Sequence, residues 1–156
     1  MAPPMNNVVL DAVDRQIIGE LAQNGRIPFA ELGRRVSMSS PAVTERVRRL
    51  EDAGVITGYR AEIDPRALGY SLTAIVRVKP AVRQLSKIAE LAAEIPQIEE
   101  CLRITGEDCF YMKLHLGSIE ELPSILDRFL LYGETSTSIV NATPVRRRDP
   151  PAIERA

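Results

Sequence analysis

Residues 37–59 read SMSSPAVTERVRRLEDAGVITGY and combine small hydroxyl side chains with closely spaced arginines. The polar residues of interest are Ser39, Ser40, Thr44, Arg46, Arg48 and Arg49. Small and hydroxyl-bearing side chains can approach base edges in the major groove of duplex DNA, and arginines further along a helix can contact phosphates. The chemistry that these residue types favour is therefore DNA binding.

A helix over residues 40–53 is predicted to present these side chains. Ser40 and Pro41 are typical of a helix start, and Gly54 is typical of a helix end. Apolar residues recur at i, i+4 and i+7 from Val43, so they face the interior and leave the polar residues outside. The alternative is a solvated face whose arginines pair with Glu45, Glu51 and Asp52.

The charge distribution favours a specific contact over indiscriminate binding. The 156-residue chain has a formal net charge of −1. Residues 34–60, however, contain six arginines and three acidic residues, which is a local surplus of three positive charges. Attraction to DNA grows with the number of phosphates neutralised, so this patch can add to a specific contact but cannot replace one.

Two further helices are predicted before this one. Asp11 can cap a helix with apolar residues at four-residue spacing from Val13, which ends at Asn24 and Gly25. Pro28 suits the start of the second helix. The apolar face of that helix is predicted to contain Phe29, Leu32, Gly33 and Val36. Residues 8–60 are thus predicted to be a winged-type helix-turn-helix domain, with extended chain after Gly54.

The second half changes to a mixture of strands and helices. Alternating apolar residues predict a strand that ends at Pro80, and helical spacing follows as far as Pro96. A hairpin with a turn at residues 106–108, a second helix and a final strand over 135–143 complete the pattern. The order β-α-β-β-α-β predicts a ferredoxin-like α+β domain over residues 71–148. Residues 61–70 are predicted to be a linker and residues 149–156 a frayed tail.

Alternation along the predicted strands also assigns their two faces. Ile98, Leu102 and Ile104 are predicted to face the helices. The opposite, open face is predicted to carry Thr73, Ile75, Cys101, Arg103, Tyr111 and Lys113. A mixed, exposed face on a small sheet is most simply a dimer interface.

An enzyme is the main alternative class, and the sequence argues against it. His115 shares a strand face with Tyr111 and Lys113, but no carboxylate joins them at an evident spacing. Cys109 lies too far along the strand for a hydrogen bond to His115. Cys101 and Cys109 form no metal-binding spacing. No catalytic residue, metal or cofactor is therefore expected, and the absence of a signal or membrane-spanning segment predicts a cytoplasmic protein.

Two motifs resemble the leucine-responsive/asparagine regulator (Lrp/AsnC) family of transcription factors. The first is Leu10-Asp11-x-x-Asp14-x-x-Ile17. The second is Ser39-x-x-x-Val43-x-x-Arg46-Val47-x-Arg49-Leu50-Glu51-x-x-Gly54. The second half resembles the family's ligand-sensing module, including Gly106 and the turn at residues 133–137. The likeness covers about residues 8–146.

This resemblance implies a nucleoid-associated regulator that binds operator DNA and forms dimers, often octamers. It implies DNA contacts by Ser39, Ser40, Thr44 and Arg48, with Arg46 and Arg49 acting as phosphate contacts or in helix packing. It also implies a small-molecule effector, such as an amino acid. The expected effector-binding residues are Gly106, Glu107, Asp108, Cys109, Thr135 and Thr137.

One departure from the family pattern concerns Cys109, because many relatives have an acidic residue at that position. The nearest carboxylates here belong to Glu107 and Asp108. A sensing or oligomerisation module that has lost DNA binding is the alternative within the same resemblance.

Overall fold

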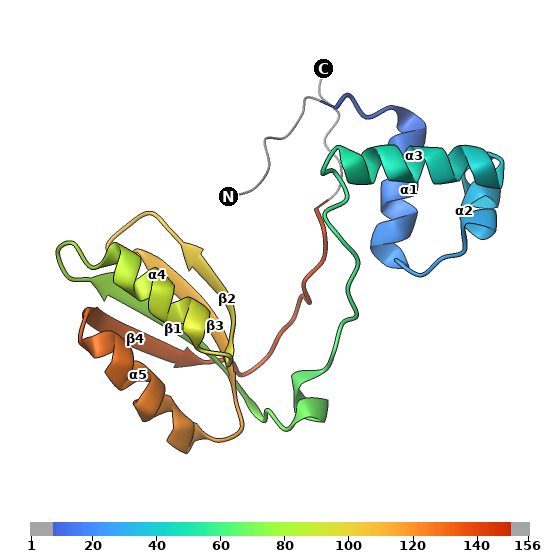
Figure 1. The fold of residues 1–156 in the computed structure, drawn as a ribbon. Helices are drawn as coiled ribbons and strands as arrows, with labels where there is room; N and C mark the ends of the chain where they lie inside the picture. Colours follow the sequence, from blue (N-terminus) through green and yellow to red (C-terminus); the bar gives the residue numbers. More distant parts are fainter. Residues whose placement is uncertain (1–7, 151–156) are drawn as a thin grey trace. The chain divides into compact units, whose positions relative to one another are not determined.

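The computed structural model describes residues 8–150 (Figure 1). The chain forms two compact units, one built mainly from the residues up to Glu62 and the other from residues 63–146. The tail predicted over residues 149–156 lies outside the described residues beyond Pro150. Within residues 8–150, no helix has the length and apolar character needed to cross a bilayer.

The first unit is built from three helices, α1 (Ala12–Gln23), α2 (Phe29–Arg35) and α3 (Ser40–Asp52). Asp11 caps α1 as predicted, and Asp14 completes a reciprocal capping box with it. One apolar cluster joins the three helices, with Ile17, Leu32, Val43 and Leu50 fully buried. Phe29 was predicted to face this cluster but is 38% exposed, because it begins α2 at the edge of the unit.

The turn between α2 and α3 depends on a close backbone approach at Gly33. The amide of Met38 donates to the Gly33 carbonyl over 2.8 Å. A Cβ atom at position 33 would lie only 2.6 Å from the Met38 carbonyl oxygen. Ser37 adopts a left-handed conformation with φ of 57° in the same turn. Glycine at position 33 therefore permits the sharp change of direction into α3.

Residues 55–63 contain no strand within the described chain, although an extended wing was expected there. The amides of Val55 and Ile56 donate to the carbonyl of Leu50, which closes the end of α3. A wing needs two paired strands, and this segment has no partner strand within its own unit.

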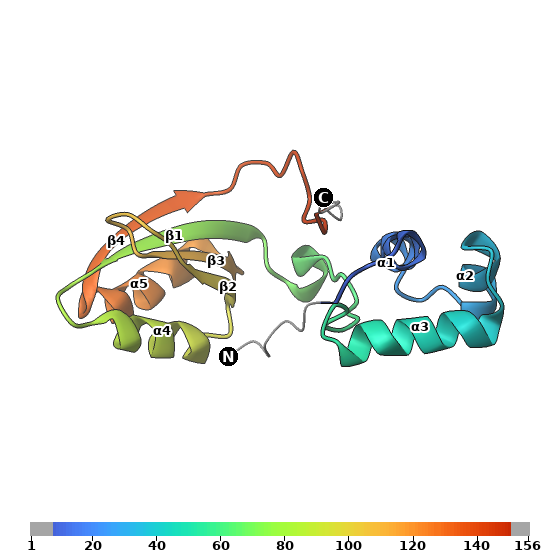
Figure 2. The ribbon, with the colours of Figure 1, turned by 90° about the horizontal axis from the view of Figure 1, so that it is seen from above.

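The second unit has the predicted βαββαβ order, preceded by the short helix η1 (Pro65–Leu68). Its strands are β1 (Leu72–Pro80), β2 (Ile98–Arg103), β3 (Phe110–Leu116) and β4 (Gly133–Ile139). They form one antiparallel sheet in the order β2-β3-β1-β4. The helices α4 (Leu85–Glu94) and α5 (Leu122–Leu130) cover the same face of this sheet (Figure 2). The ferredoxin-like prediction is therefore correct.

The core of the second unit lies between the sheet and its two helices. Ala74, Val76 and Val78 from β1 are fully buried, and Ile88 and Phe129 cover them from α4 and α5. This strict alternation is what the sequence predicted for β1.

The sequence contains two helix-start signals shortly before and within α5, and the chain uses both. Ser118 and Glu121 form a capping box that begins the 3-10 helix η2 (Ile119–Glu121). Pro123 then lies in the first turn of α5, where its missing N–H is tolerated.

Ile98 faces the helices as predicted, but the predicted facing of β2 beyond it is wrong, because the register with β3 shifts between Ile98 and Glu100. Cys101 pairs with buried Met112 and therefore lies on the helix-covered side, as does Arg103. Leu102 pairs with Tyr111 on the open face and is 44% exposed. One extra residue in a strand reverses the facing of every residue beyond it.

Candidate DNA-binding and effector-binding sites

The start of α3 presents small polar side chains to solvent. The Ser39 hydroxyl accepts a hydrogen bond from the amide of Ala42 over 3.4 Å, which makes Ser39 the cap of the helix. Ser40 and Thr44 are exposed one turn apart. The Thr44 hydroxyl donates to the Ser40 carbonyl over 2.8 Å, so its oxygen remains free to accept a hydrogen bond from a base.

Arg48 extends this exposed surface toward the C-terminal half of α3. Its Nε lies 3.9 Å from Asp52, and both side chains are about three-quarters exposed. An ion pair of this length and exposure contributes little to stability. The guanidinium can therefore exchange Asp52 for a nucleic-acid group at small cost.

Arg46 and Arg49 instead contact α1. Arg46 Nη1 donates to Asp11 over 2.6 Å and to Asp14 over 2.8 Å. Arg49 Nη2 donates to both carboxylate oxygens of Asp14 over 2.7 Å. Hydrogen bonds from the Asp14 amide and from Arg46 lower the pKa of Asp11 to about 2, so this carboxylate is ionised at neutral pH.

Asp14 belongs to the first family motif, but its role was not predicted, and it is the one fully buried charged residue among residues 8–150. Its spacing from Ile17 and Leu21 places it on the buried stripe of α1. A charged residue on an apolar stripe is the signal that could have identified it, because a buried carboxylate needs partners. Those partners lie 32 and 35 residues further along the chain.

The hairpin loop carries both expected acidic residues beside cations from β1. Gly106 has φ of 110°, which permits the turn. Glu107 lies 3.2 Å from Lys79, and Asp108 lies 3.9 Å from Arg77. The Cys109 thiol points back to the Gly106 carbonyl at 3.6 Å.

Thr135 and Thr137 lie on the other side of the sheet from these ion pairs. They pair with the buried residues Val78 and Val76, so their side chains face the helices. The Thr137 hydroxyl oxygen is buried and has no hydrogen-bond partner within the described chain. The open face of β4 instead presents Ser136, whose hydroxyl accepts from Arg77 over 3.2 Å. The six expected effector residues therefore do not share one surface.

A second polar cluster occupies the open face, and its carboxylate was missed in the sequence. Glu99 lies 2.8 Å from Lys113 and 3.0 Å from Nε2 of His115. The Thr73 hydroxyl lies 3.0 Å from Nδ1 of the same imidazole. The expectation that no carboxylate reaches His115 is wrong, because Glu99 follows inward-facing Ile98 and the pairing of β2 with β3 brings it beside this imidazole. Contact with Lys113 lowers the pKa of Glu99.

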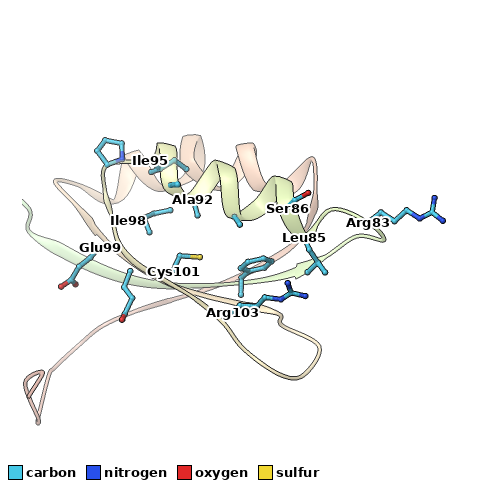
Figure 3. Close-up of a pocket in the computed structure, with 14 residues that line it drawn as sticks. Arg83, Leu85, Ser86, Ala92, Ile95, Ile98, Glu99, Cys101 and Arg103 are labelled. Atoms are coloured by element: carbon cyan, nitrogen blue, oxygen red, sulfur yellow. The ribbon is translucent and has the colours of Figure 1, made fainter. Parts of the chain in front are cut away.

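A pocket of about 820 Å³ lies between α4 and β2 (Figure 3). Its floor is apolar, with Ala92, Ile95 and Ile98 beside Cys101, and Arg103 at one end. Burial raises the pKa of the Cys101 thiol, which keeps it neutral. None of the six residues expected to bind an effector lines this pocket.

Three helices with a tight α2–α3 turn, an exposed polar helix and a separate ferredoxin-like unit define a two-domain helix-turn-helix regulator. Residues 10–51 match the AsnC-type helix-turn-helix domain, and residues 73–150 match the Lrp/AsnC ligand binding domain. The chain therefore belongs to the Lrp/AsnC family of DNA-binding transcriptional regulators.

Individual relatives agree with this assignment over most of the chain. The HTH-type transcriptional regulator LrpC of Bacillus subtilis is 34% identical over 131 residues, which are 84% of this chain and 91% of LrpC. The leucine-responsive regulatory protein of Rhizobium meliloti is 39% identical over 86% of this chain and 85% of its own length.

Solved structures give the same result. The structure of B. subtilis LrpC has a TM-score of 0.84 at 32% identity and covers 90% of this chain and 100% of its own. A feast or famine regulatory protein from Mycobacterium tuberculosis, complexed with L-methionine, has a TM-score of 0.86 at 33% identity. It covers 92% of this chain and 100% of its own. These findings favour a DNA-binding regulator over a sensing module that has lost DNA binding.

Proposed function

We propose that this protein regulates transcription by placing the start of α3 in the major groove of an operator. The main support is that one capped helix exposes four polar side chains, those of Ser39, Ser40, Thr44 and Arg48. Thr44 keeps a free acceptor oxygen, and Arg48 is only weakly paired. Side chains of these types suit base edges and neighbouring phosphates.

Alanine substitution tests whether Thr44 and Arg48 contact bases. An operator can be selected from a randomised duplex pool by binding to the wild-type protein. Thr44→Ala or Arg48→Ala should cost about 1–3 kcal/mol of binding free energy on that operator and less on a mixed-sequence duplex. Arg128→Ala is the matched control, since it removes a half-exposed arginine on α5 that pairs with Glu94.

The outcome separates two roles for these residues. Equal losses on both duplexes would assign them to phosphate contacts and end the base-reading proposal. The affinity of the wild-type protein should also fall steeply as salt is raised, because several phosphates are neutralised. A flat salt response would contradict DNA binding through this helix.

The sensing unit is proposed to bind an amino-acid-like effector at the hairpin loop over residues 106–109. A zwitterion carries one ammonium and one carboxylate, and the loop offers groups of both signs. Glu107 and Asp108 can accept from the ammonium, while Arg77 and Lys79 can donate to the carboxylate. Thr135 and Thr137, which face the helices, are proposed to support β4 and not to contact the effector.

Thermal-shift measurements with single amino acids test this site, because a ligand that binds only the folded state raises the melting temperature. Asp108→Asn should abolish the shift produced by the effective amino acid. Glu90→Gln is the control, since it neutralises a carboxylate that is paired with Lys87 on α4. A shift that survives Asp108→Asn would place the effector elsewhere, with the pocket beside α4 as the next site to test.

The open sheet face is proposed to join two copies into a homodimer, with higher assemblies such as octamers built from dimers. The face presents Ile75 and Tyr111 among both signs of charge, so a second copy can complement it. Ile75→Glu should shift the protein toward monomers in sedimentation experiments. An unchanged assembly would exclude this face as the interface.

We propose that the protein has no catalytic activity and acts in the cytoplasm as a nucleoid-associated regulator. The Glu99, Lys113 and His115 cluster is the grouping nearest to a catalytic arrangement, but it lies on the face assigned to the dimer. The test compares the regulatory activity of the wild-type protein with that of a Glu99→Gln variant. Equal activity would support a structural role for the cluster.

A further inference from the structure

Arg49 is held by a single nitrogen while half of its side chain stays exposed. Nη2 makes both contacts to Asp14, each of 2.7 Å, and the side chain is 51% exposed. A guanidinium has five N–H donors in a planar fork. The structure gives the donors on Nε and Nη1 no partner among residues 8–150.

Arg46 differs from Arg49 in both respects. Its Nη1 bridges two carboxylates, those of Asp11 and Asp14, and its side chain is only 28% exposed. The side-chain hydrogen bond to Asp11 raises the pKa of Arg46, so it remains charged and paired. Arg46 thus holds α3 against α1 and has little surface left for another ligand.

Asp14 gives Arg49 a rigid anchor. The Asp14 side chain is only 1% exposed, and its Oδ2 also accepts from the amide of Asp11 over 3.1 Å. Both carboxylates are part of the capping box that begins α1. An arginine attached to a buried, hydrogen-bonded carboxylate loses less freedom on binding a ligand than a free surface arginine.

The position of Arg49 on α3 places its exposed side near the proposed DNA surface. Successive helix residues are separated by about 100°, so Arg49 follows Arg48 around the helix toward α1. Val47 and Leu50, on the buried side of α3, are 1% and 0% exposed. Arg49 therefore lies at the border between the outward face and the α1 contact.

We infer that Arg49 is a pre-oriented ligand for a DNA phosphate, that Asp14 positions it, and that Arg46 serves only to pack α3 on α1. A phosphate oxygen can accept a charge-assisted hydrogen bond from an Arg49 donor that Asp14 does not use, such as those on Nη1. This inference rests on the proposed insertion of α3 into the major groove. It assigns different roles to Arg46 and Arg49, which the sequence alone could not distinguish.

Salt dependence of binding distinguishes a phosphate contact from a packing role. Binding of Arg49→Gln to the selected operator and to a mixed-sequence duplex is measured across a salt series. It should weaken equally on both duplexes, and the slope of log affinity against log salt should fall by about 0.9. Arg49→Lys should retain most of the slope, because it retains the charge.

Arg46→Gln is the matched control within the same cluster. It should lower the melting temperature of the protein while leaving the salt slope at the wild-type value. Asp14→Asn should lower affinity on both duplexes and keep the slope, because Arg49 stays charged but loses its anchor.

Two results would overturn the inference. One is a wild-type slope for Arg49→Gln, and the other is an equal loss of slope for Arg46→Gln. Both are distinct from failure of the proposed function, in which the wild-type protein itself shows no salt-dependent binding. Unchanged affinity of Asp14→Asn would remove the positioning role of Asp14 alone.

Discussion

Gly33→Ala is expected to strain the turn that orients α3, and Gly19→Ala provides a matched control. Both glycines lie inside helices, so alanine should contribute about 1 kcal/mol of intrinsic helix stability at either position. At Gly19, an added Cβ meets no atom within 4 Å. Gly19→Ala should therefore stabilise the first unit by about 1 kcal/mol.

At Gly33 the same methyl group meets backbone. Its distance of 2.6 Å from the Met38 carbonyl oxygen is well short of the 3.4 Å at which ordinary contact begins. Backbone in a hydrogen-bonded turn cannot move aside as a flexible side chain can, and overpacking of this kind costs about 1–3 kcal/mol. Because the intrinsic gain is common to both variants, the difference between them should equal this cost.

Amide hydrogen exchange in α1 and α3 provides the assay, since it reports the first unit without interference from the second. Exchange should be faster than wild type or unchanged in Gly33→Ala and slower in Gly19→Ala. Affinity for the selected operator should fall only in Gly33→Ala, because the turn sets the direction of α3. Equal protection in the two variants would refute the claim that the α2–α3 turn requires glycine.

Three further outcomes concern individual polar groups. The pKa of Glu99 is lowered by Lys113, so its contribution to stability is present above its ordinary pKa and is lost as pH falls; Glu99→Gln should flatten the acid limb of a melting-temperature profile. Burial and the hydrogen bond to Glu51 raise the pKa of Tyr59 to about 12. The resulting stability should be lost as pH rises from 10 toward 12. Spectrophotometric titration of the wild-type protein and of Tyr59→Phe measures the pKa of this phenol by difference. Thr137→Val removes a buried hydroxyl without a partner in the described chain and should raise the free energy of unfolding by about 1 kcal/mol in a denaturant titration; loss of the effector-induced thermal shift in that variant would return Thr137 to the binding site.

Local sequence was sufficient where the deciding interactions lie within one element. The Asp11 cap, the start of α3 at Ser40 and Pro41, and the end of β1 at Pro80 all depend on residues a few positions apart, although the cap of α3 is Ser39 and not Ser40 as predicted. The exposed polar set on α3 was predictable for the same reason, because helical spacing from Val43 determines which side chains face outward.

Long-range pairing decided the remaining features of the sites. The register shift in β2 moved Cys101 to the helix side, and alternation alone could not anticipate an inserted residue. The pairing of β2 with β3 brought Glu99 beside His115, a contact between two strands. The placement of Arg77 and Lys79 beside the hairpin acids likewise depends on how the sheet aligns β1 with the loop.

The sequence by itself determined the order of elements, the family and the helix that carries the DNA-facing residues, because these follow from local spacing and motifs. Only the tertiary structure decided what Arg46 and Arg49 contact. Their partner Asp14 is more than thirty residues away, and a buried carboxylate between two helices exists only when the helices pack together.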